Sequence, residues 1–462
     1  MPSNSSDASN APQQSNTAAN TALNNAANPR PAPLVANLIG SDNADTLSGD
    51  RNDNSYSAGA GNDLLLASSG NDNFSGGTGI DTLDYSGVNA NLTLSRGGVL
   101  SKSNNRGTDT ITGFDIEVIR ANPNQINTID GATGTTASLN VNLSTKTLTI
   151  NNLPGIGSAS LTVENFQNVN GSENADAIIG DDLRNVLNGN GGNDTISGGG
   201  GDDTFIGSTG SDTYRGESGF DTLNYEASST GVTLVRGGTV LKQDGSIDTI
   251  ADFSVEAVVG AQGQTNTIDG STGVTASLAV DLSNESLTIN NLPFVGTAQL
   301  VVKNFTDVKG SENADAITGS NGRNALNGGG GNDVLTGLGG ADLLTGGGGI
   351  DTFVFNRADS LLNGFDRITD LEIGSDLIDG LVTASSVSQF GVVAALTGSD
   401  ISQVLTAQGF GAGLAASFTL GSGSSSRTFL AINDNRNGFQ AGSDNIVEIT
   451  GYSGQLSQLQ VV

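Results

Sequence analysis

A strict nine-residue period runs through three stretches of this chain and constrains its fold more than any other feature. Each nonapeptide carries an Asp or Asn at one fixed position and an apolar residue two positions later, as in GGTGIDTLD (76–84) and GGGGDDTFI (198–206). Glycine adopts backbone dihedrals that other residues avoid, so the glycine-rich half predicts a turn. The half that follows predicts a short β-strand. Repeats of this kind stack, and each unit buries its apolar side chain against its neighbours.

The three stretches keep their phase without a slip. The phase residues are Asp45, Asn54, Asp63, Asp72 and Asp81 in the first block, Asp176, Asn185, Asp194, Asp203, Asp212 and Asp221 in the second, and Asp315, Asn324, Asp333, Asp342 and Asp351 in the third. The apolar residues two positions after them predict a buried ladder at the core of each block. This ladder begins with Leu47 in the first block, Ile178 in the second and Ile317 in the third.

Two nonapeptides are expected to make one coil of a flattened, right-handed parallel β-roll, so that residues eighteen positions apart face each other across neighbouring coils. The all-aspartate pairs predicted in this way are Asp45/Asp63, Asp63/Asp81, Asp176/Asp194, Asp194/Asp212, Asp203/Asp221, Asp315/Asp333 and Asp333/Asp351. Pairs that contain an asparagine keep one carboxylate, and we expect weaker cation binding there. An arginine stands close to each of these asparagines, at Arg51, Arg184 and Arg323. Two interpretations remain open for these turns, a degenerate repeat and a site of lower affinity.

The absence of cysteine and histidine limits the chemistry of these side chains. Thiolate and imidazole ligands are excluded, so a metal site has to use hard oxygen ligands, which suit calcium. The chain has 48 Asp and Glu against 18 Lys and Arg, a net charge of -30 that repels nucleic acid and anionic lipid. We predict several calcium ions. The predicted metal-site residues are Asp45, Asp63, Asp72, Asp81, Asp176, Asp194, Asp203, Asp212, Asp221, Asp315, Asp333, Asp342, Asp351, Gly76, Gly198, Gly328 and Gly346.

Calcium is expected to be required for folding. Each nonapeptide buries little apolar surface compared with the backbone freedom that it loses. Stacked carboxylates also repel one another unless a cation lies between them. We therefore predict a chain that is largely unfolded without calcium and folded with it.

The complete motifs resemble those of the RTX, or hemolysin-type calcium-binding, proteins; they are GGTGIDTLD, GGGGDDTFI, GGGGNDVLT (328–336) and GGGGIDTFV (346–354). The resemblance implies parallel β-rolls, calcium held by aspartates and backbone carbonyls, and export by type I secretion machinery that reads an uncleaved C-terminal signal. DRITDLEIGSDLIDG (366–380) looks like the strand pair that closes many such rolls. FLAINDNRNGFQAGSDNIVEITGYSG (429–454) resembles the C-terminal domain of cyanobacterial surface proteins.

The chain also contains a duplicated module. GSENADAIIG (171–180) returns as GSENADAITG (310–319), and DTLDY (81–85) returns as DTLNY (221–225). No cleavable signal peptide or membrane span is visible, and helix signals are scarce, the best lying at 399–408. We predict an all-β protein with a disordered tail (1–36), β-roll blocks (37–86, 171–226 and 310–357), β-rich modules (87–170 and 227–309) and a β-rich C-terminal secretion and surface domain (358–462).

These features favour a secreted or cell-surface structural or interaction protein that folds on calcium binding outside the cell, and they do not favour an enzyme. Candidate partners besides calcium are cell-surface glycans and copies of the chain itself. Exposed polar residues in 275–291 are candidates for such contacts, or are plain solvated strands. The alternative is a type I-secreted hydrolase that uses the repeats as an export and folding tail, for which only the short segment 1–36 stands ahead of the first repeat.

A second spacing leaves one more alternative open. Its residues fit an EF-hand-like loop, with amides at three of the ligand positions: Asn433, Asn435, Asn437, Gly438 and Asp444. Amides bind calcium more weakly than carboxylates, and a turn between two strands explains the same residues. The spacing is therefore consistent with an additional ion site or with a turn.

Overall fold

The computed structural model describes residues 36–462 apart from 133, 135, 274, 381, 385 and 386. The chain forms two compact units, one ending at Asp203 and one beginning at Thr204. Almost all of the regular structure described is β-strand, as predicted. The predicted disordered tail, residues 1–36, lies outside the described residues except for Ala36, which begins the first strand.

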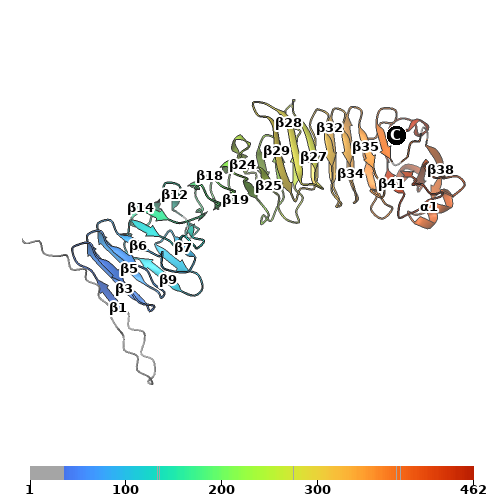
Figure 1. Ribbon diagram of the computed structural model, residues 1–462. Helices are drawn as coiled ribbons and strands as arrows, with labels where there is room; N and C mark the ends of the chain where they lie inside the picture. Colours follow the sequence, from blue (N-terminus) through green and yellow to red (C-terminus); the bar gives the residue numbers. More distant parts are fainter. Residues whose placement is uncertain (1–35, 133, 135, 274, 381, 385–386) are drawn as a thin grey trace, which may run out of the picture. The chain divides into compact units, whose positions relative to one another are not determined.

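The first nonapeptide block forms the coils of a parallel β-roll. Odd-numbered and even-numbered strands pair separately, because two nonapeptides complete one coil. Partners in neighbouring coils lie eighteen positions apart, as Tyr56 and Phe74 do, and Figure 1 shows β1, β3 and β5 as successive arrows. The predicted coil is confirmed. Its strands are β1 (Ala36–Ile39), β2 (Thr46–Ser48), β3 (Asn54–Ala60), β4 (Leu64–Leu66), β5 (Asn73–Thr78) and β6 (Thr82–Asp84).

The apolar ladder forms the core of the rolls. The rings of Tyr56 and Phe74 stack with their centroids 4.4 Å apart. Leu47 is only half-buried, because β2 is the first strand of its sheet among the described residues and pairs with β4 on one side. The other ladder residues are buried, at Tyr56, Leu65, Phe74, Leu83, Ile178, Leu187, Ile196, Phe205, Tyr214, Leu223, Ile317, Leu326, Leu335, Leu344 and Phe353.

The module after the first block continues the same coil with longer turns. β9 pairs in parallel with β5, and β10 pairs in parallel with β6. Two antiparallel insertions, β7–β8–β9 and β12–β13–β14, lengthen the turns. Its strands are β7 (Leu92–Ser95), β8 (Val99–Lys102), β9 (Gly107–Ile111), β10 (Val118–Arg120), β11 (Thr128–Asp130), β12 (Ser138–Asn142), β13 (Thr147–Leu153), β14 (Gly157–Glu164) and β15 (Asn168–Asn170).

The second block spans both units, and the module after it repeats the first module. The strands of the block are β16 (Ala177–Ile179), β17 (Val186–Asn188) and β18 (Thr195–Gly200) in the first unit, and β19 (Thr204–Ile206), β20 (Thr213–Ser218) and β21 (Thr222–Asn224) in the second. In the module, β22–β23–β24 and β27–β28–β29 are again antiparallel, and β24 pairs with β20. The module contains β22 (Val232–Val235), β23 (Thr239–Lys242), β24 (Ile247–Ile250), the 3-10 turn η1 (Ala251–Phe253), β25 (Ala257–Val259), β26 (Thr267–Asp269), β27 (Ser277–Asp281), β28 (Ser286–Leu292), β29 (Gly296–Lys303) and β30 (Asp307–Lys309).

The third block ends on a strand pair from the segment 366–380, as its sequence indicated. β36 (Asp366–Ile368) pairs with β34, and β37 (Leu377–Gly380) pairs with β35. The last coil of the roll therefore uses residues beyond the nonapeptides. The strands within the block are β31 (Ala316–Thr318), β32 (Ala325–Gly330), β33 (Val334–Thr336), β34 (Leu343–Gly348) and β35 (Thr352–Phe355).

The C-terminal region packs around a small apolar core of its own that includes Ile401, Phe410, Phe418 and Phe429. Its one α-helix among the described residues, α1 (Gly398–Val404), lies where the sequence favoured a helix and is capped by the side chain of Thr397. No helix in the described part of the chain has the length and apolar character needed to cross a membrane. The other elements are β38 (Ser388–Val393), β39 (Ala415–Leu420), η2 (Gly423–Ser425), β40 (Arg427–Ile432), β41 (Asn445–Glu448) and η3 (Leu456–Gln458).

Candidate metal centre

The aspartates of neighbouring coils form a hydrogen-bonded ladder. Because parallel strands place residues eighteen positions apart side by side, the Oδ1 atom of the later aspartate accepts the backbone N–H of the earlier one. The structure therefore brings together residues that were predicted to share an ion. The pairs joined in this way, at 2.7–3.0 Å, are Asp45/Asp63, Asp63/Asp81, Asp176/Asp194, Asp315/Asp333 and Asp333/Asp351.

Two further predicted pairs, Asp194/Asp212 and Asp203/Asp221, have one member in each unit and stay predictions. The remaining phase aspartates accept in the same manner from an asparagine of the preceding coil. Asp72, Asp203 and Asp342 each accept the backbone N–H of the residue eighteen positions earlier, at 2.8 Å.

Three interior aspartates have a second carboxylate oxygen that is buried and makes no hydrogen bond in the described part of the chain. Oδ2 of Asp63, Asp81 and Asp333 has no hydrogen bond among the described residues, and the three residues are at most 2% exposed. Burial disfavours the charged form of a carboxyl, so it raises the pKa of all three side chains, that of Asp333 to about 7. A buried carboxylate is costly unless an opposite charge lies beside it. These oxygens therefore fit a bound cation.

The predicted glycines leave room beside the carboxylates. A Cβ atom on Gly328 would lie 2.2 Å from Oδ2 of Asp333 and 2.6 Å from the carbonyl oxygen of Gly346, so a carboxylate oxygen and a carbonyl oxygen converge there. A Cβ on Gly76 would lie 2.5 Å from Oδ2 of Asp81 in the same way. Gly198 has the matching place in its motif. A donor set of carboxylate and carbonyl oxygens, without nitrogen or sulfur, suits calcium.

The interior aspartates stand in a row along the ladder, so that Asp333 has Asp315 on one side and Asp351 on the other. In the ranges that the structure describes, no three acidic side chains converge on a point that could hold a metal ion. A site in this roll would therefore consist of two carboxylates, one from each of two neighbouring coils, together with backbone carbonyls. This is the composition that the eighteen-residue stacking predicts.

The first aspartate of each block differs from those inside the block. Its Oδ2 atom accepts the backbone N–H of a serine four positions earlier at 2.5 Å, because the first motif of each block carries serine after its glycine. These carboxylates therefore have a partner in the absence of a cation. Their role as metal ligands stays a prediction. The aspartates concerned are Asp45, Asp176 and Asp315, and the serines are Ser41, Ser172 and Ser311.

The three blocks match the model of the RTX calcium-binding nonapeptide repeat, at residues 37–65, 48–83, 170–205, 179–214, 206–224 and 318–353. The chain carries RTX calcium-binding repeats. These RTX segments cover less than half of the chain and leave most of the modules and of the C-terminal region outside. No curated protein matches the chain. The resemblance of 429–454 to cyanobacterial surface proteins stays a prediction.

Among solved structures, the extracellular lipase LipA from Serratia marcescens is similar in part. It is 17% identical over 64% of this chain and 40% of the lipase, with a TM-score of 0.15. The chain thus spans less than half of the lipase's length. A similarity of this extent carries no argument about activity.

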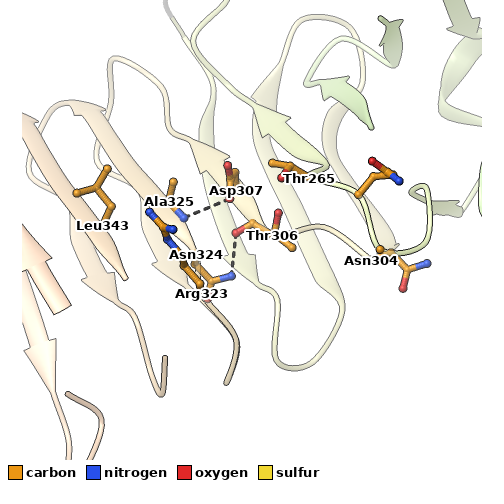
Figure 2. A pocket seen from close by; sticks show the side chains of 10 residues that line it. Thr265, Asn304, Thr306, Asp307, Arg323, Asn324, Ala325 and Leu343 are labelled. Atoms are coloured by element: carbon orange, nitrogen blue, oxygen red, sulfur yellow. Dashed lines mark hydrogen bonds between the residues drawn. The ribbon is translucent and has the colours of Figure 1, made fainter. Parts of the chain in front are cut away.

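Two of the three asparagines of the RTX ladder, Asn185 and Asn324, bridge neighbouring coils through their own amides. Nδ2 of Asn185 donates to the carbonyl of Gln167 at 2.9 Å, and Nδ2 of Asn324 donates to that of Thr306 at 2.8 Å. Figure 2 shows the second bond at the edge of a hollow of about 600 Å³, which Arg323 also lines. Each amide thus satisfies a carbonyl oxygen of the preceding coil. Weaker ion binding at these turns stays a prediction, and the amide gives it a physical reason.

The ladder also continues beyond the RTX repeats, through residues that were not predicted as ligands. Asp109, Asp248 and Asp366 accept the backbone N–H of the last aspartate in one sheet of each block, at 2.9–3.0 Å. They follow that aspartate after 37, 36 and 24 residues, so the nine-residue period does not mark them. One signal was available in the sequence. Each is followed two positions later by an isoleucine, as a phase aspartate is by its apolar residue, at Ile111, Ile250 and Ile368.

The EF-hand-like spacing near the C-terminus forms a turn that its own side chains hold. Nδ2 of Asn433 donates to the carbonyls of Phe410 and Gly411 at 3.2 and 2.8 Å. Both carboxylate oxygens of Asp444 accept backbone N–H groups of the same loop. These contacts favour the interpretation as a turn.

Proposed function

We propose that this chain is a calcium-binding structural or interaction protein of the extracellular space or the cell surface, and that it folds when calcium binds outside the cell. The observation that carries the proposal is the buried aspartate ladder, in which Oδ2 of Asp63, Asp81 and Asp333 has no hydrogen-bond partner within the described residues. Calcium between the coils supplies the missing positive charge. The RTX repeats support calcium as the ion.

Calcium concentration would then decide where the chain folds. Extracellular modules bind calcium with dissociation constants of about 10⁻⁴–10⁻³ M. Ions therefore load outside the cell, while inside it the chain stays unfolded and suited to export by type I secretion machinery. Cell-surface glycans and further copies of the chain are the proposed partners, and the net charge of -30 opposes association with nucleic acid or anionic membranes.

Circular dichroism and small-angle scattering of the full chain during a calcium titration test this function. We expect compaction and a rising β-signal as calcium reaches the range of 10⁻⁴–10⁻³ M, and no such change with magnesium at equal ionic strength. A strong β-signal in excess chelator at neutral pH would show that the coils do not need the ion. Loading at submicromolar calcium would contradict folding outside the cell.

We also propose that the role is not catalytic. The sequence has no histidine and no cysteine, so a general base or nucleophile would have to come from other groups. The carboxylates of the described ladder pairs each hold a backbone N–H of the neighbouring coil. A screen of the calcium-loaded chain with ester, peptide and glycoside substrates is expected to give the rate of a heat-denatured control. Turnover above that rate would favour the secreted hydrolase.

A further inference from the structure

The last coils of the three RTX blocks share one pattern of strand pairing and hydrogen bonding. In each, the last aspartate of one sheet is paired with an aspartate beyond the repeats, through the strand pairs β5–β9, β20–β24 and β34–β36. The earlier aspartate donates its N–H to Oδ1 of the later one at 2.9–3.0 Å. Its carbonyl accepts the N–H of the next residue of the partner strand. The closing pairs are Asp72/Asp109, Asp212/Asp248 and Asp342/Asp366.

In the first closing coil, a lysine supplies the positive charge. Nζ of Lys102 lies 2.6 Å from Oδ1 of Asp109 and 3.7 Å from Oδ2 of Asp72, and all three side chains are fully buried. The same ammonium group donates to the carbonyl of Ser68 at 2.9 Å. Two carboxylates and a carbonyl therefore surround a cation that belongs to the chain. Lys102 reaches this place from β8, the middle strand of the antiparallel insertion.

The second closing coil repeats the arrangement. Nζ of Lys242 lies 2.7 Å from Oδ1 of Asp248 and 3.7 Å from Oδ2 of Asp212. It donates to the carbonyls of Ser208 and Gly210, both at 2.6 Å. These two carbonyls stand four and two residues before the aspartate of the repeat. Both copies of the duplicated module thus place a lysine ammonium group between the two aspartates of the closing coil.

A tyrosine completes each of these two coils. The hydroxyl of Tyr85 donates to Oδ2 of Asp109 at 2.6 Å, and that of Tyr225 donates to Oδ2 of Asp248 at 2.5 Å. Both oxygens of each later aspartate are therefore satisfied. Neither coil needs an ion at this position.

The third closing coil lacks both groups. The residue that corresponds to the two tyrosines is Phe355, in DTFVF against DTLDY and DTLNY, and the segment 356–365 before β36 contains no lysine. Its one arginine, Arg357, pairs with Asp434 instead. Oδ2 of Asp342 and Oδ2 of Asp366 are buried without a hydrogen-bond partner in the described structure, and the residues are 2% and 0% exposed.

We propose that Asp342 and Asp366 bind a calcium ion at the position that Lys102 and Lys242 occupy in the first two closing coils. The carbonyls of Leu338 and Gly340 stand four and two residues before Asp342, as Ser208 and Gly210 stand before Asp212, and they complete the oxygen donor set. The inference rests on the proposed calcium-binding function. It adds a site whose ligand Asp366 lies outside the residues 318–353 that match the RTX repeat.

The surroundings set the expected affinity of this site. Asp342 lines a surface hollow of about 360 Å³, which gives an ion access from solvent. Arg323 lines the same hollow, and its charge acts against cation binding. We therefore expect weaker binding here than at Asp333/Asp351, where no arginine is among the charges that shift the pKa of either aspartate.

Counting bound calcium on the full chain, by equilibrium dialysis and elemental analysis, tests the site. Asp366→Asn is expected to bind one ion fewer per chain than the unmodified protein at saturating calcium. The matched control is Asp379→Asn, which removes the same charge from an exposed residue of β37 and should leave the count unchanged. Equal counts for Asp366→Asn and the unmodified protein would overturn the proposal, provided that circular dichroism shows the variant folded.

The reciprocal variant keeps the test decisive if Asp366→Asn fails to fold. Lys242→Met removes the internal cation between Asp212 and Asp248 and is expected to gain one calcium ion. An unchanged number of bound calcium ions would show that the ammonium group of Lys242 does not occupy a potential calcium position. That result would overturn the proposal. An unmodified chain that binds no calcium would instead refute the proposed function. The two failures are therefore distinguishable.

Discussion

The coils of the RTX blocks and those of the intervening modules share a backbone plan and differ in the side chains that join them. In the third block, Oδ1 of Asp333 accepts a backbone N–H, and its Oδ2 has no hydrogen-bond partner among the described residues. In the second module, Oδ1 of the buried Asn266 accepts the N–H of Val232 at 3.0 Å, while Nδ2 donates to the carbonyls of Ala261 and Asn304 at 2.9 and 2.6 Å.

Asn127 makes the same set of bonds in the first module, to Leu92, Asn122 and Asn165. An amide carries a donor and an acceptor in one group, whereas a carboxylate carries acceptors only. The amide therefore joins two coils by itself, whereas a carboxylate can only accept, and Oδ2 of Asp333 finds no donor among the described residues. Calcium dependence would accordingly reside in the aspartate coils, while the asparagine coils are complete without an ion.

The largest expected effect follows from Asp333→Asn, because Asp333 belongs to two of the aspartate pairs. We expect the loss of up to two ions, each worth about 2.7 kcal/mol when calcium stands at 100 times its dissociation constant. Calorimetry over a calcium series measures this loss as a smaller slope of the melting temperature against the logarithm of calcium concentration. An unchanged slope would mean that the pairs do not hold calcium.

A smaller effect is expected from Asn266→Ala in the module. The substitution leaves buried carbonyl and N–H groups unpaired, at a cost of about 1–3 kcal/mol for each group. The melting temperature should fall at every calcium concentration, with the same slope as in the unmodified chain. Asn127→Ala serves as the matched repeat. A smaller dependence of the melting temperature on calcium concentration in either variant would show that calcium binds in the module. The contrast between aspartate coils and asparagine coils would then be wrong.

The smallest effect concerns pH. Burial raises the pKa of Asp333 to about 7, above the value of 3.8 for an unperturbed aspartate. The calcium-free fold therefore gains stability from this group at acid pH and loses it as the pH rises through about 7. Calcium has to displace the proton, so its affinity should fall by less than tenfold between pH 7 and pH 6. Titration calorimetry at the two pH values checks this, and tighter binding at pH 6 would contradict it.

The sequence by itself determined the coil, its register and its core. The period is local and repeats in phase, so two nonapeptides per coil place Asp315 beside Asp333, and Leu326 on the buried ladder. The glycines could be predicted for the same reason, since Gly328 stands a constant five positions before the carboxylate that it accommodates.

Only the tertiary structure decided which carboxylates already have a positive partner. Lys102 meets Asp72 across an antiparallel insertion, and Asp366 meets Asp342 after a connection of 24 residues. These connections differ in length from coil to coil. No period in the sequence therefore marks which residue after a connection pairs with the ladder again. The charge balance of each coil depends on side chains that such insertions bring back to the ladder, and for that reason it is a property of the folded chain.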